Sequence, residues 1–248
     1  MLVPYGLLVL LSLGSGWSFP HLLPDRLDGA PWRHFIADRN AMLHAVAMSA
    51  VMSLAVATLS TIGGILVGRA LRRVRSDLWR FLACLPFVVS PVVVGVCLYD
   101  LLIRMRLAGT VGGVILLQTV FALGFASMLF SEMWTPRTDR FEQLVRTLGG
   151  NTAAVWRHAI LPQISGLIAI CFVQTALYSW LDYGLVSVIG GGHVSTVTTK
   201  LFGYLREASV NQAAQAGLVL LAPSLLAFAV TAAASATAAG RSTEEIAR

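Results

Sequence analysis

Charged residues are scarce in this chain of 248 residues. Only 12% of them are Asp, Glu, Lys or Arg, whereas 56% are hydrophobic and the mean hydropathy is +0.75. Because soluble domains carry about 25% charged residues, this composition excludes an ordinary soluble globular domain. Lysine is nearly absent, with Lys200 the only one, so the net charge of +6 comes from arginine. In a membrane protein such an excess reports orientation rather than nucleic-acid binding.

Motifs that carry chemistry are missing as well. The chain has no G-x-x-x-x-G-K-[ST], so it does not bind ATP by that device, and any ATP-driven transport would need a separate ATPase subunit. It also lacks G-x-S-x-G, H-E-x-x-H and paired carboxylates at a catalytic spacing. The three cysteines lie in apolar runs and the five histidines are scattered, which favours packing and loop roles over metal binding. We therefore expect no catalytic residue, metal or cofactor in this chain.

Six long apolar runs are separated by shorter polar segments. At about 1.5 Å per helical residue, a run of about 20 residues crosses the hydrocarbon core of a bilayer. The sequence therefore predicts an all-α integral membrane protein with six transmembrane helices, forming a single transmembrane domain over residues 1–248. The predicted spans are residues 2–19, 41–68, 81–103, 111–130, 164–186 and 215–237.

Two of these runs contain further local signals. Residues 2–19 resemble a secretory signal peptide in length, but they lack a basic n-region and an A-x-A-like cleavage site. Because five more spans follow, we interpret this run as the first transmembrane helix. In the second run, Gly63-Gly64 predicts a close contact with another helix.

Basic residues are distributed unevenly among the segments between the runs. Residues 69–80 contain five arginines and a single acid, Asp77. If this segment is cytoplasmic, so are residues 132–162 and the C-terminal tail, and that side holds eleven basic residues against seven on the other. The positive-inside rule then predicts that both termini and residues 132–162 face the cytoplasm.

Residues 132–162 form the sizeable segment of the C-terminal half that has the pattern of a water-facing amphipathic element. An apolar stripe at i, i+3, i+4 and i+7 predicts a helix, and its members are Phe141, Leu144, Val145 and Leu148. Thr135 followed by Pro136 is a typical helix start, and Gly149-Gly150 is a typical end. Asn151 is expected to cap a second short helix over residues 152–158, and Pro162 to mark the entry into the fifth span. Such a pair of helices makes a surface for docking another protein.

The spacing of this segment resembles the EAA loop of permease subunits of ABC-type importers. That pattern is Glu-Ala-Ala, three residues, Gly, nine residues, then Ile-x-Leu-Pro. Here Gln143-Leu144-Val145 occupies the position of Glu-Ala-Ala, Gly149 that of the glycine, and Ala159-Ile160-Leu161-Pro162 that of the final four residues. Arg146-Thr147-Leu148-Gly149 matches the commonest sequence at the centre of the pattern. The chain departs from the pattern at the acidic position, which holds Gln143 with Glu142 beside it, and at both alanines, which are larger.

The resemblance implies a fold, a mechanism and a set of partners. It implies a helical permease in a bacterial inner membrane that pairs with a second permease, identical or related, around a central pathway. It also implies two ABC ATPase subunits, which bind the ATP and Mg²⁺, an extracytoplasmic solute-binding protein and surrounding membrane lipid, with no nucleic acid. The ATPase-coupling loop implied by the match consists of Glu142, Gln143, Arg146, Gly149, Gly150, Asn151, Thr152, Ala153, Ala154, Val155, Trp156, Leu161 and Pro162.

Within that loop, the resemblance places the coupling helix at residues 150–156. Val155 and Trp156 would form an apolar knob that docks on the ATPase, with burial of the tryptophan contributing on the order of 2–3 kcal/mol. The alternative is that Trp156 anchors the loop at the level of the lipid headgroups.

The end of the fifth apolar run suggests a transport pathway. Ser179-Trp180-Leu181-Asp182-Tyr183-Gly184, followed by Ile189-Gly190-Gly191, resembles the fifth-span ending of permeases in the sulfate, polyamine, iron and thiamine importer group. Asp182 would line the pathway or the outer gate; alternatively, it caps a helix end or pairs with an arginine. Gln174 and Tyr178 precede Asp182 by eight and four residues, so the three form a polar stripe on one helix face. Asp100 is expected to pair with Arg104 at i+4, and Gln118 is a weaker candidate.

Two other functions compete with the ABC-type permease. An ATP-independent secondary transporter or channel would show inverted repeats and broken helices at matching positions, and a membrane-embedded enzyme would show a His/Asp/Glu cluster at one depth. The sequence shows neither pattern. The transported solute is not specified, although a mixed polar and aromatic lining with one acid slightly favours a cationic or zwitterionic solute.

Overall fold

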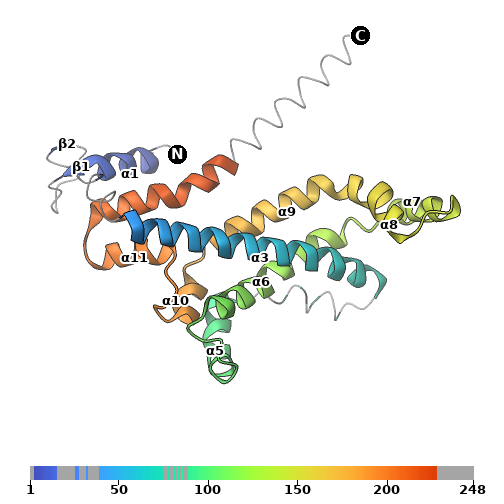
Figure 1. Ribbon diagram of the computed structural model, residues 1–248, viewed down its shortest axis with the longest axis horizontal. Coiled ribbons are helices and arrows are strands. Elements are labelled where there is room, and N and C mark those ends of the chain that lie inside the picture. The colour runs from blue at the N-terminus through green and yellow to red at the C-terminus, as the bar shows by residue number, and fades with distance from the viewer. Residues whose placement is uncertain are drawn as a thin grey trace, which may run out of the picture. The chain divides into compact units, whose positions relative to one another are not determined.

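The part of the chain that the computed structural model describes is mostly helical, with short turns between the helices and two strands of two residues each (Figure 1). The described residues are 3–15, 26–27, 39–74 and 89–227, with the single positions 32, 78, 81, 83 and 85. Most of the basic segment beyond residue 74, and the C-terminal tail, lie outside them. The chain divides into two compact units, unit 1 with residues 1–47 and 195–248 and unit 2 with residues 48–194. The single domain expected over residues 1–248 stays a prediction.

Four of the described helices are long and apolar enough to cross a membrane, which confirms the all-α membrane fold. They match the second, fourth, fifth and sixth predicted spans, and they are Asn40–Arg73, Val111–Ser131, Leu161–Leu181 and Val210–Ala227. The predicted count of six is not confirmed, because the first and third apolar runs form shorter helices in the described residues.

The first apolar run is not one continuous helix. Helix α1 covers Val3–Leu13 and is about 16 Å long, roughly half the thickness of a bilayer core. It gives way to strand β1, Gly14–Ser15, which pairs antiparallel with strand β2, Arg26–Leu27. The predicted span over residues 2–19 is therefore wrong in its extent. Glycine at position 14 explains the end of α1, because it is a weak helix former.

The third predicted span, residues 81–103, is matched only in its second part. Helix α5 covers Pro91–Arg104, and its N-cap, Ser90, has an extended backbone. Proline is well tolerated in the first turn of a helix, where its missing N–H has no partner to lose. Much of the stretch before residue 89 lies outside the described residues.

Unit 1 contains a helix between the fifth and sixth predicted spans. Helix α11 covers Val197–Arg206, and Thr196 and Thr199 form a capping box at its start. The last described helix, Val210–Ala227, begins five residues earlier than predicted. The amide of Gln215 donates a hydrogen bond to the carbonyl oxygen of Ser12, so this helix is tied to the end of α1.

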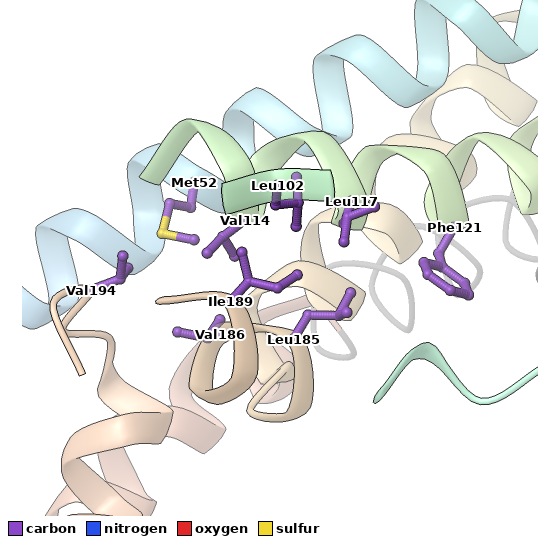
Figure 2. Close-up of a cluster of buried hydrophobic side chains, with 9 residues drawn as sticks. All are labelled: Met52, Leu102, Val114, Leu117, Phe121, Leu185, Val186, Ile189 and Val194. Carbon is purple, nitrogen blue, oxygen red and sulfur yellow. The ribbon is translucent and has the colours of Figure 1, made fainter. Parts of the chain in front are cut away.

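The core of unit 2 is built by helices that meet around α10, Gly184–Gly190 (Figure 2). The buried cluster draws on α3, Arg39–Arg73, and on α6, Val111–Ser131, as well as α5 and α10. Its members are Met52, Leu102, Val114, Leu117, Phe121, Leu185, Val186, Ile189 and Val194. The cluster fixes the end of unit 2 that lies farthest from helices α7 and α8 (Figure 1).

Small residues let α3 and α6 approach closely, as the Gly63-Gly64 pair predicted. A Cβ atom at Gly64 would lie 2.4 Å from the Cβ of Ala126, and one at Gly68 would lie 2.9 Å from the carbonyl oxygen of Ser127. Helix pairs in membranes are commonly held by such contacts between small residues. The two helices are therefore closely packed along the half of α3 that leads to Arg69.

Candidate functional site

Helix α7, Pro136–Thr147, begins and ends where the sequence predicted. Thr135 caps its start by accepting a hydrogen bond from the backbone of Thr138. Past its end, Gly149 adopts a φ of +81°, a conformation that glycine reaches without strain. Gly150 is needed for a different reason, because a Cβ atom there would lie 2.7 Å from the carbonyl oxygen of Val145.

The second helix of the loop differs from the prediction in its form. Asn151 caps it as expected, with its side-chain oxygen 2.8 Å from the backbone nitrogen of Ala154. Helix α8 is only Thr152–Ala154, and a π-helix, η1, follows over Val155–Ile160. Helix α9, Leu161–Leu181, continues from η1 without a break, with Pro162 in its first turn. Pro162 therefore marks the entry into the fifth span, as expected, whereas the expected helix over residues 152–158 is wrong in its length and type.

The π-helix turns Val155 toward the interior of the protein. Its hydrogen bonds run from i to i+5, so Val155 and Ile160 lie on one face, with Ile164 a turn further along. All three are buried, and they pack with Trp134 in a cluster that also includes Trp156 at its edge. The prediction that Val155 forms part of an outward-facing knob is wrong, since only 1% of its surface is exposed.

Trp156 is half-buried and contacts Trp134, which lies in the connection between α6 and α7. Their ring centroids are 6.3 Å apart at an interplanar angle of 78°, an edge-to-face arrangement. The two indoles thus join the beginning of the loop to its last turn.

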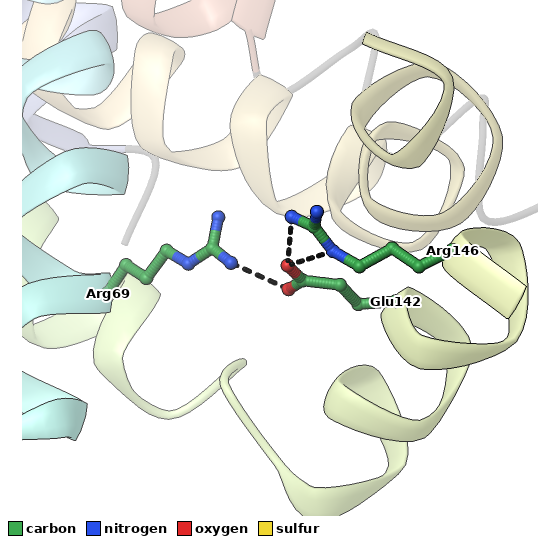
Figure 3. Close-up of polar contacts among 3 residues, drawn as sticks. All are labelled: Arg69, Glu142 and Arg146. Carbon is green, nitrogen blue, oxygen red and sulfur yellow. Dashed lines mark hydrogen bonds and ion pairs between the residues drawn. The ribbon is translucent and has the colours of Figure 1, made fainter. Parts of the chain in front are cut away.

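Glu142 also faces its own chain, where it binds two arginines (Figure 3). Its Oε2 accepts a hydrogen bond of 2.6 Å from Nη2 of Arg69 on α3, and its Oε1 accepts one of 3.0 Å from Nη2 of Arg146 on α7. Partial burial alone would raise the pKa of Glu142. Hydrogen bonds and charge from Arg146 and Arg69 outweigh that effect, and the pKa lies below its ordinary value of 4.5. The carboxylate is therefore ionised at neutral pH, and its contribution to stability is lost only as the pH falls below about 4.5 through the lowered pKa.

The remaining predicted loop residues are mostly on the outer surface. Leu148 is 79% exposed and Leu144 is 54% exposed, so the apolar stripe of α7 is only partly covered by the chain itself. Gly150 and Ala154 are half-buried, and the other exposed residues of the predicted loop are Gln143, Arg146, Gly149, Asn151, Thr152, Ala153, Leu161 and Pro162. An apolar surface on the segment between two spans is typical of an interaction site.

The fifth predicted span, residues 164–186, ends early, and Asp182 lies just beyond it. Helix α9 stops at Leu181, and the backbone of Asp182 is extended. One oxygen of Asp182 accepts from the backbone nitrogen of Leu185 in α10 at 3.4 Å. This contact is the one expected if Asp182 caps the end of a helix. A role of Asp182 in lining a pathway stays a prediction.

Asp182 also belongs to a polar network that the sequence did not predict. The amide nitrogen of Gln118 on α6 donates to Asp182 at 2.8 Å, and the hydroxyl of Ser179 donates to the amide oxygen of Gln118, also at 2.8 Å. Gln118 is completely buried. A glutamine within an otherwise apolar run was the available signal, but its partners are more than 60 residues away in sequence.

Gln174 and Tyr178 line a cavity of about 230 Å³, as part of the stripe predicted on α9. The other lining residues come from α5, α6 and α9, and they are Pro91, Phe121, Ala122, Phe125 and Thr175. Asp182 is not among them, so the structure does not gather the whole stripe at one cavity. The hydroxyl of Tyr178 is buried without a hydrogen-bond partner in the described part of the chain.

Two further sequence observations concern charged and metal-binding groups. Arg104 pairs with Asp100 at 2.9 Å, as expected from their i+4 spacing, and both side chains are exposed. Within the described residues, no group of three or more His, Cys, Asp or Glu side chains is arranged to hold a metal ion.

Comparison with known proteins identifies one family. A family model described as "Binding-protein-dependent transport system inner membrane component" matches residues 60–237, which is 178 of the 248 residues. The match includes the whole loop, the polar network and the cavity. A search of curated proteins found no match.

Proposed function

The chain belongs to the family of binding-protein-dependent transport system inner membrane components, and from this premise we propose that its loop, residues 132–162, couples transport to ATP hydrolysis on a separate subunit. Membership makes the chain an integral inner-membrane protein and a transport permease of a binding-protein-dependent ABC importer rather than an enzyme. The absence of a P-loop from the sequence supports a separate ATPase, which would hold the ATP and Mg²⁺.

The observation that carries this proposal is the exposed apolar stripe of α7. Leu148 and Leu144 expose 79% and 54% of their surface on a segment between two spans. Burying a leucine side chain against a partner contributes about 1.5–3 kcal/mol, so the two together give an ATPase subunit a substantial docking contact. The residues that dock are thus Leu144 and Leu148, with the exposed turn at residues 149–153, in place of Val155.

The proposed assembly has the loop on the cytoplasmic side. The side chain of Arg69 bonds to Glu142 of the loop, and Arg72 and Arg73 follow it in the last turn of α3. The basic end of α3 and the loop therefore lie at one end of unit 2. The positive-inside rule assigns that end to the cytoplasm. A second permease, identical or related, and an external solute-binding protein complete the importer.

Leu148→Asp is expected to release the ATPase. The complex is purified through a tag on the full-length chain, and its nucleotide-binding subunit is identified by photolabelling with azido-ATP. Loss of leucine burial together with desolvation of a carboxylate should lower the co-purified ATPase activity at least tenfold, since 1.4 kcal/mol corresponds to a factor of ten.

The matched control is Asp139→Asn, an exposed position on the opposite side of α7 from Leu148. It should retain the ATPase within about twofold. Equal retention in both variants would contradict docking through the stripe. Solute accumulation by proteoliposomes that contain the permease and no ATPase would instead support the secondary transporter or channel.

The cavity beside α9 is proposed as part of the solute pathway. Its walls combine aromatic rings with the amide of Gln174 and the hydroxyl of Tyr178. In a variant whose native cysteines are replaced, Gln174→Cys is expected to react with a water-soluble thiol reagent. Ala169→Cys lies about 140° around α9 from position 174 and should react at least tenfold more slowly. The opposite order of labelling would exclude this cavity from the pathway.

A further inference from the structure

Arg69 contacts three separate parts of the loop from its position in the last two turns of α3. Its guanidinium donates to Glu142 of α7 at 2.6 Å. Its central carbon also lies 4.8 Å from the ring centroid of Trp134 and 5.8 Å from that of Trp156. The connection before α7, helix α7 itself and the π-helix after it therefore all meet at one side chain.

The chemistry of arginine suits this arrangement. A guanidinium is planar, so it donates hydrogen bonds in its plane while its face lies against aromatic rings. The side chains of Arg69 and Glu142 are only 21% and 14% exposed, and partly buried charges are screened by salt less than exposed ones. The attraction between Arg69 and Glu142 is consequently weakened less by salt than that of an exposed ion pair of the same length.

Arg146 binds the same carboxylate but makes a different connection. It lies on α7 four residues after Glu142, and 50% of its side chain is exposed. This second ion pair joins α7 to itself, whereas the first joins α7 to α3 (Figure 3). Arg146→Gln is therefore a matched control for Arg69→Gln, because both arginines bind the same carboxylate.

Helix α3 is in turn held firmly in unit 2. Gly64 and Gly68 bring its backbone against Ala126, Ser127 and Phe130 of α6, at distances where an added Cβ atom would overlap. Packed interfaces of this kind move as bodies rather than deforming continuously. A displacement applied to Arg69 is therefore passed to the whole helix.

We propose that Arg69 is a positioning residue that makes α3 move together with the loop when the ATPase displaces it. Helix α9 receives the same displacement through the continuous backbone of η1. The motion of the loop therefore reaches the membrane along two routes, the backbone from η1 to α9 and the contacts of Arg69 with the loop. This proposal rests on the proposed function, because it needs an ATPase that moves the loop.

The test uses two reporters in the full importer, each in a background whose native cysteines are replaced. A nitroxide spin label is attached at Leu66→Cys on α3 or at Ile170→Cys on α9, both of which are exposed in this chain. Its mobility is measured by electron paramagnetic resonance before and after trapping with Mg-ATP and vanadate. In the otherwise unchanged importer, both reporters are expected to respond.

With Arg69→Gln, the response at residue 66 is expected to fall at least fivefold, while the response at residue 170 stays within about 30% of its original size. Arg146→Gln removes only the ion pair within α7, so it should lower the response at residue 66 by much less than Arg69→Gln does. In a Glu142→Gln background the ion pair to Arg69 is already absent, and Arg69 keeps its contacts with Trp134 and Trp156. Adding Arg69→Gln should then remove only the part of the residue-66 response that depends on those two contacts. Arg69→Lys keeps the charge without the planar fork, so it should give an intermediate response in an assembled complex.

An unchanged response at residue 66 in Arg69→Gln would overturn the proposal, as would a residue-66 reporter that never responds while residue 170 does. Equal loss at both positions would also overturn it, because Arg69 would then merely hold the loop in shape. Failure of the proposed function has a different signature. In that case neither reporter responds in the unchanged importer, and no subunit that is photolabelled by azido-ATP co-purifies with it.

Discussion

Gly64→Val is expected to lower the thermal unfolding temperature of the detergent-purified protein by about 10 °C. A Cβ atom at Gly64 would lie 2.4 Å from the Cβ and 2.9 Å from the carbonyl carbon of Ala126, and backbone atoms cannot rotate away. Overpacking costs about 1–3 kcal/mol or more, and 1 kcal/mol corresponds to roughly 2–4 °C at this chain length. Circular dichroism during heating measures the change.

Two other glycines provide graded controls for that variant. A Cβ atom at Gly63 would meet only the end of the Leu123 side chain, at 2.7 Å, which can turn aside. Gly63→Ala should therefore change the unfolding temperature little. Gly166→Ala meets nothing within 4 Å inside α9, and alanine is about 0.8–1.0 kcal/mol better than glycine in a helix, so it should stabilise the protein slightly. If Gly64→Val unfolded at the same temperature as these two variants, the close packing of α3 on α6 would be disproved.

Gln118→Leu should be as damaging, because it removes both a donor and an acceptor from a buried network. Asp182 would lose the amide that donates to it, and Ser179 would lose its acceptor. Leaving a buried polar group without its hydrogen-bond partner costs about 1–3 kcal/mol, and more when the group is charged. We expect a fall of roughly 10 °C in unfolding temperature, measured in the same way.

A neutral partner should partly restore stability in the Gln118→Leu protein. Asp182→Asn in that background replaces the carboxyl group that lost its amide donor with a neutral amide, and it should recover about half of the lost unfolding temperature. The control on the same helix is Ser127→Ala, since Ser127 is buried but donates only within α6, to Gly124. Its effect should stay below about 1.5 kcal/mol. Equal effects of the two single variants would show that the network adds nothing beyond local helix contacts.

Local chemistry was enough to predict the elements that depend on neighbouring residues. Apolar length alone indicated the helices over Asn40–Arg73 and Val111–Ser131. Thr135 and Gly149 marked the ends of α7, Asn151 marked the start of α8, and each makes the expected contact or adopts the expected conformation. These signals work at short range because a cap or a turn requires only the backbone beside it.

The orientation of the loop side chains was not predictable in the same way. The family resemblance placed Val155 in an outward-facing knob, whereas the π-helix places it inward with Ile160. No local sequence pattern indicated a π-helix here. Glu142 was assigned to the ATPase-coupling loop without a partner residue, and it binds Arg69, which is 73 residues earlier. Such contacts follow from how α3 packs, and that information is distributed over the glycines and small residues of two helices.

The junction between the loop and the membrane contains one π-helix, Val155–Ile160. A turn closed from i to i+5 accommodates one residue more than an ordinary turn closed from i to i+4. Shortening this stretch by a single residue therefore yields a regular helix in which the segments on either side keep their rotational phase. Lengthening it by one residue does not give a regular helix. We therefore expect this junction to tolerate the deletion of one residue better than the insertion of one.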